Sequence, residues 1–181
     1  MNRREIKDID FKEAFSTSCV WYFREVIDEL GKKTMQRELD RLAYGNREIS
    51  DWKGKLNTNN NNRALTGFWI ESSLKISAKE QVEVLERIFE KKVTYKPRTL
   101  RLLKKAMAVT DQEDLKAPFY GKTGMGMRKG IVVDAWYAGF AEGLKGNVYF
   151  CVHLGRSDKE EVSSAKAKEI AIQIVSDYMG K

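Results

Sequence analysis

Residues 121–126 read Gly-Lys-Thr-Gly-Met-Gly and stand where a helix-rich sequence becomes strand-rich. Two apolar runs follow, Ile131–Glu142 and Val148–Leu154, separated by the turn residues 143–147. Apolar runs of this length joined by a short glycine-containing turn are typical of β-hairpins. With Lys116–Lys122 as its first strand, this part of the chain is predicted to form a three-stranded antiparallel meander.

The residues before the meander predict two helices in succession. Ser18 can cap a helix whose apolar positions reach Leu30, because a serine hydroxyl accepts from the first unpaired backbone N–H groups. Gly31 is then a C-terminal stop, and Thr34 can cap a second helix. That second helix is predicted to end near Tyr44, beside a glycine and an asparagine that tolerate positive φ.

Three further helices are predicted. Ser77-Ala78-Lys79-Glu80 is a capping box that opens a helix to about residue 90. Pro97 suits the first position of another helix, which reaches about residue 109. Residues 160–178 are predicted to form a last helix that packs on the sheet. The apolar residues available for that packing are Val162, Ala165, Ile170, Ile174 and Tyr178.

These elements predict one α/β domain of the α+β type, in which an antiparallel sheet is flanked by helices. A helical region would cover about residues 14–112, and the strands with the last helix about residues 113–181. The chain has 181 residues, of which 42% are hydrophobic, so one packed core is feasible. The polar residues 57–62, mostly asparagine, predict a loop.

Basic residues outnumber acidic ones. Lys and Arg total 33 and Asp and Glu total 26, which gives a net charge of +7. The excess is spread along the chain, which indicates either an ordinary basic surface or attraction to anions such as nucleic acid, membranes or small carboxylates. Aromatic and basic residues are not interleaved as in single-strand binding platforms, so no nucleic-acid partner is predicted.

We expect neither a membrane-crossing segment nor a leader nor a metal-ligand set from this sequence. No apolar run reaches the roughly 18–20 residues that span a bilayer, and the charged start at Met1 does not resemble a signal peptide. Cys19 and Cys151 lie in apolar surroundings typical of buried thiols, and His153 has no partner at metal-ligand spacing. We therefore expect no cofactor, no metal and no membrane segment in this chain. The sequence does not define an oligomeric state.

Four short elements follow one another along the chain: Ser18-Cys19-Val20, Tyr44-Gly45-Asn46, Phe68-Trp69 and Lys122-Thr123-Gly124. In this order they resemble the class D serine β-lactamases and the related penicillin-sensing domains of β-lactam sensor-transducers. The resemblance covers nearly the whole chain. It implies a β-lactamase/transpeptidase-like fold and a β-lactam or peptidoglycan-like small molecule as ligand. It also implies a full-length protein that is secreted or at the cell surface of a bacterium.

The resemblance implies three catalytic candidates. Ser18 would pass a proton to the departing lactam nitrogen, and Lys122 would supply positive potential beside it. Trp69 would hydrogen-bond through its indole N–H to a carbamylated lysine that acts as general base. From the residues alone, Ser18 is equally well a helix cap and Trp69 a core side chain.

The same resemblance implies a substrate-binding strand edge. Thr123 would donate to the substrate carboxylate, Gly124 would permit close approach, and the backbone N–H of Met125 would be an oxyanion donor. A cation from the last helix, Lys166 or Lys168, would complete carboxylate binding. Without the family, this stretch reads as an ordinary glycine-rich strand end. The wall of the site would be formed by Val20, Tyr44 and Asn46.

The chain departs from the family at the nucleophile. The family's Ser-x-x-Lys element precedes Ser-x-Val by several tens of residues, whereas 17 residues precede Ser18. Matches to Ser-x-x-Lys at 72–75 and 163–166 are interpreted as coincidences, because neither begins the first core helix. No residue is therefore assigned as nucleophile. The domain is expected to be truncated, without its N-terminal strands and nucleophile helix, and to be inactive by itself.

Three alternatives stay open at this point. One is a penicillin-sensing domain of a sensor-transducer instead of an enzyme. Another is a non-catalytic remnant whose basic surface binds an acidic partner. The third is a fragment that does not fold stably alone, because missing strands would expose sheet edges and part of the core.

Overall fold

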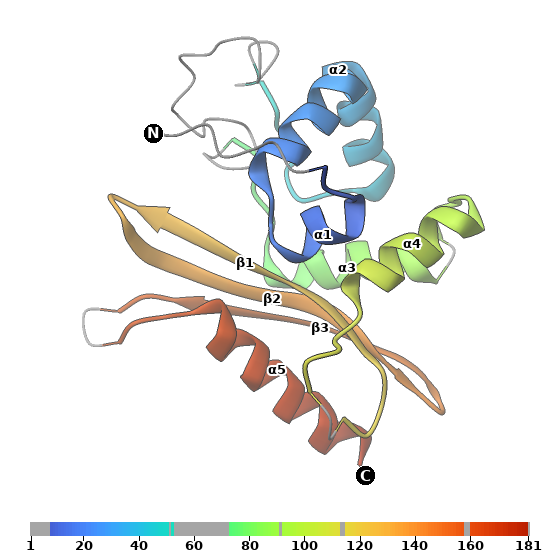
Figure 1. Ribbon diagram of the computed structural model, residues 1–181, viewed down its shortest axis with the longest axis vertical. Coiled ribbons are helices and arrows are strands. Elements are labelled where there is room, and N and C mark those ends of the chain that lie inside the picture. The colour runs from blue at the N-terminus through green and yellow to red at the C-terminus, as the bar shows by residue number, and fades with distance from the viewer. Residues whose placement is uncertain are drawn as a thin grey trace.

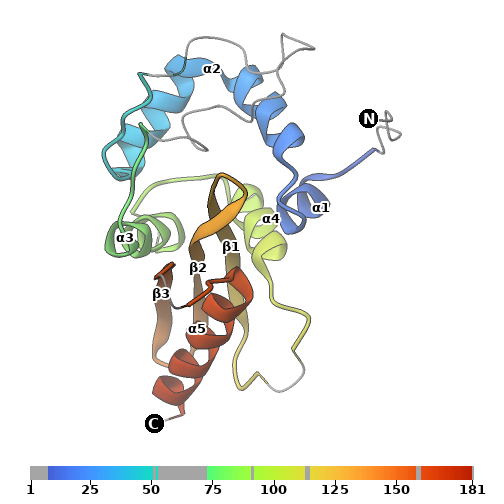
Figure 2. The ribbon, with the colours of Figure 1, turned by 90° about the vertical axis from the view of Figure 1, so that its left-hand side faces the viewer.

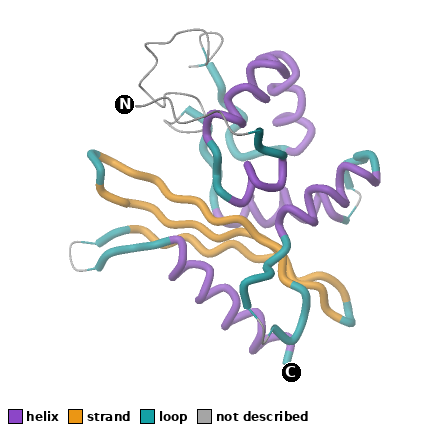
Figure 3. The backbone as a smooth tube through the Cα atoms, viewed as in Figure 1, coloured by secondary structure: helices purple, strands orange, loops and turns teal. Residues whose placement is uncertain are grey.

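A computed structural model describes residues 8–50, 52, 73–90, 92–112, 115–157 and 160–180. Helices and one sheet make up the architecture (Figures 1 and 3). The helices are α1 (Phe11–Ser16), α2 (Val20–Leu42), α3 (Ala78–Phe89), α4 (Pro97–Met107) and α5 (Ser164–Met179). The strands are β1 (Phe119–Arg128), β2 (Ile131–Gly143) and β3 (Gly146–Gly155).

The sheet is antiparallel with the strand order β1-β2-β3, which confirms the predicted meander. Helix α5 lies on one face of the sheet, and α1 to α4 lie on the other (Figures 1 and 2). This arrangement is the predicted α+β architecture. Because both faces are covered, β2 can be apolar on both sides, as its sequence is.

Two clusters of buried side chains lie on opposite faces of the sheet. On the α5 face, Tyr137 packs with Phe119 and Phe150. On the other face, Phe140 packs with Leu85 of α3 and with residues of α4. Side chains alternate between faces along a strand, so β2 contributes to both clusters, and each fully buried large side chain stabilises the fold by about 1.5–3 kcal/mol.

Helix α5 is rotated relative to the predicted packing. It begins after Ser163, whose hydroxyl accepts from the backbone N–H of Lys166 at 3.2 Å. Ile174 and Tyr178, predicted to face the sheet, are 61% and 67% exposed, so that prediction is wrong. The buried stripe is a neighbouring one, in which the small side chains of Ala167 and Ala171 let the helix approach the sheet closely. The buried residues of α5 are Ala167, Ala171, Ile172 and Val175.

Strand β1 begins and ends later than the predicted Lys116–Lys122. Its glycines do not end the strand, because Gly121, Gly124 and Gly126 all keep paired partners in β2. Gly121 is required by packing: a Cβ added there would lie 2.4 Å from the ring of Tyr137. The strand is irregular only where the register shifts between Gly126 and Met127.

The N-terminal helices differ from the prediction at their ends. Asp10 caps a short helix, α1, that the sequence pattern did not indicate, and its carboxylate accepts from Glu13 N–H at 2.8 Å. The N-cap of α2 is Cys19, so Ser18 is not the cap. The predicted break at Gly31 is confirmed by its φ of 74°, whereas Thr34 lies inside the helical span and does not cap it.

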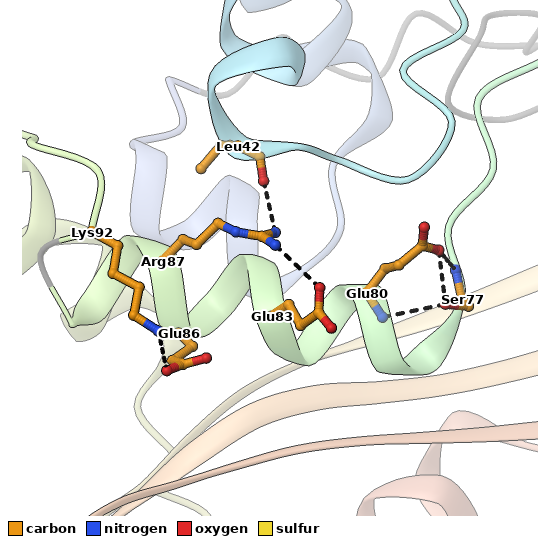
Figure 4. Close-up of polar contacts among 7 residues, drawn as sticks. All are labelled: Leu42, Ser77, Glu80, Glu83, Glu86, Arg87 and Lys92. Carbon is orange, nitrogen blue, oxygen red and sulfur yellow. Dashed lines mark hydrogen bonds and ion pairs between the residues drawn. The ribbon is translucent and has the colours of Figure 1, made fainter.

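Helix α3 joins the helical region to the rest of the fold. Its predicted capping box is confirmed, with Ser77 and Glu80 bonded reciprocally (Figure 4). Arg87 donates to the Leu42 carbonyl at the C-terminus of α2 at 3.0 Å and to Glu83 at 3.1 Å (Figure 4). A cation at a helix C-terminus satisfies carbonyls that have no partner within the helix. Helix α4 begins at Pro97, as predicted.

Candidate functional site

The side chains of Ser18 and Lys122 meet where the turn between α1 and α2 lies against β1. The Lys122 ammonium donates to the Ser18 hydroxyl at 2.5 Å, across 104 positions of sequence. Ser18 adopts a φ of 53°, in the left-handed region that disfavours side chains with a Cβ by about 1–2 kcal/mol. The turn is held on both sides, because Ser18 N–H donates to Phe15 and Cys19 N–H to Ala14.

Lys122 is half-buried in a setting of oxygen acceptors and one aromatic ring. Besides Ser18, its ammonium donates to the Thr123 carbonyl at 2.9 Å and to the Thr123 hydroxyl at 3.3 Å. The ring centre of Phe15 lies 5.9 Å from the ammonium. Burial lowers the pKa of Lys122, since desolvation disfavours its charged form. The site therefore holds a cation whose proton is easier to release than that of an exposed lysine.

Thr123, Gly124 and Met125 continue along the edge of the described sheet. Strand β1 pairs with β2 alone among the described strands, so alternate backbone groups on its outer side have no strand partner. Thr123 and Gly124 are half-buried, and the Met125 side chain is 58% exposed on the face opposite to Lys122. Within the described ranges, no strand pairs with the backbone of this edge beside Lys122.

The wall residues occupy three different settings. Val20 is the first residue of α2 and is half-buried. Tyr44 packs on a cluster around Leu39 and Ile49, and burial raises its pKa, with the nearby Cys151 contributing. Asn46 takes part in the link between the turn after α2 and the chain before α3. Tyr44 and Asn46 thus contribute to the packing and hydrogen bonding of the helical region, and the role of all three residues as a wall of the site stays a prediction.

The side chain of Asn46 makes three hydrogen bonds. Its amide nitrogen donates to the Ser73 carbonyl at 2.7 Å, and its oxygen accepts from Lys75 N–H at 3.0 Å and Glu48 N–H at 3.2 Å. The neighbouring Gly45 lies so close to Lys75 that an added Cβ would be 1.9 Å from its carbonyl oxygen. The Tyr-Gly-Asn element is therefore a structural clamp in this chain.

Other predicted residues lie elsewhere. Trp69 and Phe68 are outside the described residues, as is Ser72 of the first Ser-x-x-Lys match. Ser163 of the second match caps α5. Lys168 binds Asp111, with both carboxylate oxygens at 2.8 Å, and Lys166 is exposed. Neither lysine contacts Lys122 or Ser18 in the described part of the chain.

Sequence reasoning missed the contribution of Phe15 to this site. Phe15 belongs to α1, a helix of six residues that the periodicity did not indicate. Its carbonyl accepts a hydrogen bond from Ser18 N–H, and its ring lies beside the Lys122 ammonium. Its three-residue distance from Ser18 was the available signal. The described residues contain no group of three or more potential metal ligands, and none of the described helices is long and apolar enough to cross a bilayer.

A helix-covered antiparallel sheet with a serine–lysine pair beside its edge strand defines a domain of the serine β-lactamase/transpeptidase class. The family model described as the penicillin-binding protein transpeptidase domain matches residues 1–176. The chain therefore belongs to the penicillin-binding protein transpeptidase domain family.

Relatives of two kinds match nearly the whole chain. The regulatory protein BlaR1 of Staphylococcus aureus is 29% identical over 174 residues, which are 96% of this chain and 26% of BlaR1. β-Lactamase OXA-1 of Escherichia coli is 31% identical over 162 residues, 88% of this chain and 56% of that protein. The chain thus spans little more than half, or less, of these relatives' lengths.

Solved structures show the same fold. A class D β-lactamase, FUS-1 from Fusobacterium nucleatum subsp. polymorphum, superimposes with a TM-score of 0.74 at 28% identity, covering 94% of this chain and 64% of that one. The C-terminal domain of the Bacillus licheniformis BlaR penicillin-receptor gives a TM-score of 0.76 at 24% identity, covering 98% of this chain and 67% of that one. Both comparisons confirm the β-lactamase/transpeptidase-like fold.

Proposed function

We propose that this chain is part of a β-lactam-recognising domain of the class D β-lactamase type. Its ligand would be a β-lactam or a peptidoglycan-like small molecule that carries a carboxylate. The observation that supports this most strongly is the contact between Ser18 and Lys122, which joins two of the family elements into one site. A matching family model over residues 1–176 supports the same proposal.

In this proposal Lys122 and Thr123 hold the carboxylate of the ligand. The Lys122 ammonium is half-buried, so its attraction to an anion is screened less than that of a surface lysine. The Thr123 hydroxyl lies 3.3 Å from the ammonium and can turn its own proton toward a carboxylate oxygen. Gly124 and the backbone N–H of Met125 would line the edge along which the lactam carbonyl lies.

Ser18 would move a proton. Its hydroxyl accepts from Lys122 and can donate its own proton outward at the same time. When a hydroxyl nucleophile, to which no residue is assigned, bonds to the lactam carbonyl carbon and the C–N bond breaks, Ser18 would give its proton to the leaving nitrogen and take one from Lys122, which is left neutral. The lowered pKa of Lys122 favours that transfer, because a desolvated ammonium is a stronger acid.

We assign no nucleophile and no general base among these residues, and the role of Trp69 remains the one that the family resemblance implies. The relatives include a β-lactamase and a regulatory protein, so the proposal is made at the level common to both: recognition of the ligand and proton transfer to its nitrogen. For the whole protein we propose a place outside the cytoplasmic membrane, secreted or at the bacterial cell surface.

A fluorescent penicillin tests whether the chain recognises a β-lactam and whether it forms a covalent adduct with it. The 181-residue chain is incubated with it, and binding is followed by fluorescence anisotropy, then by denaturing gel and intact mass. We expect saturable binding that is lost on denaturation, with no stoichiometric adduct. A stoichiometric covalent adduct would show that a nucleophile is present, and an absence of binding would overturn the recognition proposal.

A further inference from the structure

Beyond Lys122, the same face of the sheet carries two positions without side chains. Residues two apart along a strand share a face, so Gly124 and Gly126 lie on the face of Lys122. We call these two residues the glycine shelf. Their partners in β2 are Trp136 and Asp134, whose side chains stand beside the shelf on that face.

Trp136 presents an aromatic surface to the shelf. It lies in a row across the sheet, with Gly124 on one side and His153 on the other. The rings of Trp136 and His153 are stacked, with centres 4.0 Å apart and planes at 22°. The second face of the indole therefore borders the space above Gly124, where an added Cβ would lie 3.5 Å from Trp136 Cβ.

Asp134 presents a carboxylate to the other end of the shelf. Its Oδ1 lies 2.7 Å from His153 Nε2, which fixes the side chain. Its Oδ2 leans over the shelf, because a Cβ added at Gly126 would lie 3.2 Å from it. The Asp134 side chain is 43% exposed, and no hydrogen bond to Oδ2 is present among the described residues.

We propose that the glycine shelf, Trp136 and Asp134 form a subsite for an ammonium group on the acyl side chain of a β-lactam. This rests on the proposed function, in which the carboxylate of the ligand lies at Lys122 and Thr123. A carboxylate beside the face of an indole is the combination that attracts an ammonium ion, by charge and by the ring quadrupole. An anionic side chain would be repelled by Asp134.

The distances suit a ligand with opposite charges at its two ends. Gly126 lies three residue steps beyond Thr123 along an extended strand, which corresponds to about 10 Å. A penicillin with an amino group on its acyl chain has its carboxylate and ammonium at opposite ends of a molecule of this length. The carboxylate of the ligand would thus lie at the basic Lys122, and its ammonium group would lie at the acidic Asp134.

Ampicillin and benzylpenicillin provide a matched pair of probes, because they differ only in an amino group on the acyl side chain. The ¹⁵N-labelled 181-residue chain is titrated with each at pH 7, and the Trp136 indole N–H signal is assigned from a Trp136→Phe spectrum. We expect ampicillin to bind about three- to tenfold more tightly, the size of a partly exposed ion pair together with a cation–π contact. The Trp136 signal should shift more with ampicillin.

Asp134→Asn should abolish the preference, because it weakens the binding of ampicillin to about the strength of benzylpenicillin. Glu169→Gln is the control, since it makes the same charge change at an exposed position of α5 on the far face of the sheet. Equal binding of both penicillins, or an unchanged preference in Asp134→Asn, would overturn the subsite and leave the proposed function intact. Binding of neither penicillin would overturn both.

Discussion

The ring of Tyr137 lies against the α-carbon of Gly121, where an added Cβ would be 2.4 Å from ring atom Cζ and from the hydroxyl oxygen. Tyr137 is 2% exposed and belongs to the buried cluster that includes Phe119 and Phe150, so it has little room to move away. We therefore predict that Gly121→Ala lowers the free energy of unfolding by about 1–3 kcal/mol or more, as overpacking does. Urea unfolding of the purified chain measures this change.

Gly124→Ala is the control for that experiment. It makes the same chemical change in the same strand, but the added Cβ would lie 3.5 Å from Trp136 Cβ, an ordinary contact. We expect its unfolding free energy to stay within about 0.5 kcal/mol of the parent. Equal losses in the two variants would contradict the assignment of Gly121 as the packing glycine.

Two tyrosines that differ in their hydroxyl partners should respond oppositely to Tyr→Phe. The Tyr137 hydroxyl is buried without a hydrogen-bond partner among the described residues, whereas the Tyr149 hydroxyl donates to Glu90 at 2.7 Å. We predict that Tyr137→Phe is neutral or stabilising by up to about 1 kcal/mol, and that Tyr149→Phe is destabilising by about 1–2 kcal/mol. The urea unfolding midpoints of both variants measure these changes. Destabilisation of similar size in both variants would contradict the prediction.

The clamp at Asn46 gives a third prediction. Asn46→Ala removes three hydrogen bonds to backbone groups and should cost about 1–3 kcal/mol of stability. Asn46→Asp keeps an acceptor for Lys75 and Glu48 but loses the donor to Ser73, so it should cost less. Thermal unfolding of the two variants checks the order, and a larger loss in Asn46→Asp than in Asn46→Ala would count against the clamp.

Lys122 should make stability depend on pH in the alkaline range. Its pKa is lowered by burial from the ordinary value of 10.5, so between the lowered pKa and 10.5 the unfolded chain binds more protons than the folded chain. The stability contributed by Lys122 therefore increases as pH rises through that interval. Urea unfolding at several pH values should show that the free energy of unfolding of the parent rises relative to that of Lys122→Met as the pH approaches 10. A difference that stays constant or falls with pH would contradict this.

Much of the fold was predictable because its signals are local. The capping box at Ser77, the proline at Pro97 and the glycine at Gly31 mark helix ends through the chemistry of a few adjacent residues. The apolar runs around a short turn predicted the hairpin of β2 and β3. These features depend on neighbours in sequence and not on the rest of the fold.

Features set by tertiary packing were not predictable. The prediction of which α5 residues are buried was wrong, because Ala167 and Ala171 allow a closer approach to the sheet than the larger Ile174 would. The periodicity of apolar residues carries no information on how closely a helix approaches a sheet. The extent of β1 depends on its pairing with β2 through three glycines. In the site, the family resemblance brought Ser18 and Lys122 together, but nothing local indicated that Phe15 lies beside them.

The central claim is that Lys122 and Thr123 hold the carboxylate of a β-lactam. The most direct test is an equilibrium titration of the 181-residue chain with benzylpenicillin, compared with Thr123→Val and with the exposed control Thr110→Val. We predict saturable binding that Thr123→Val weakens about tenfold or more, as expected for a lost hydrogen bond to a charged group, while Thr110→Val binds like the parent. Binding of equal strength in the parent and Thr123→Val, or no binding in the folded parent, would contradict the account.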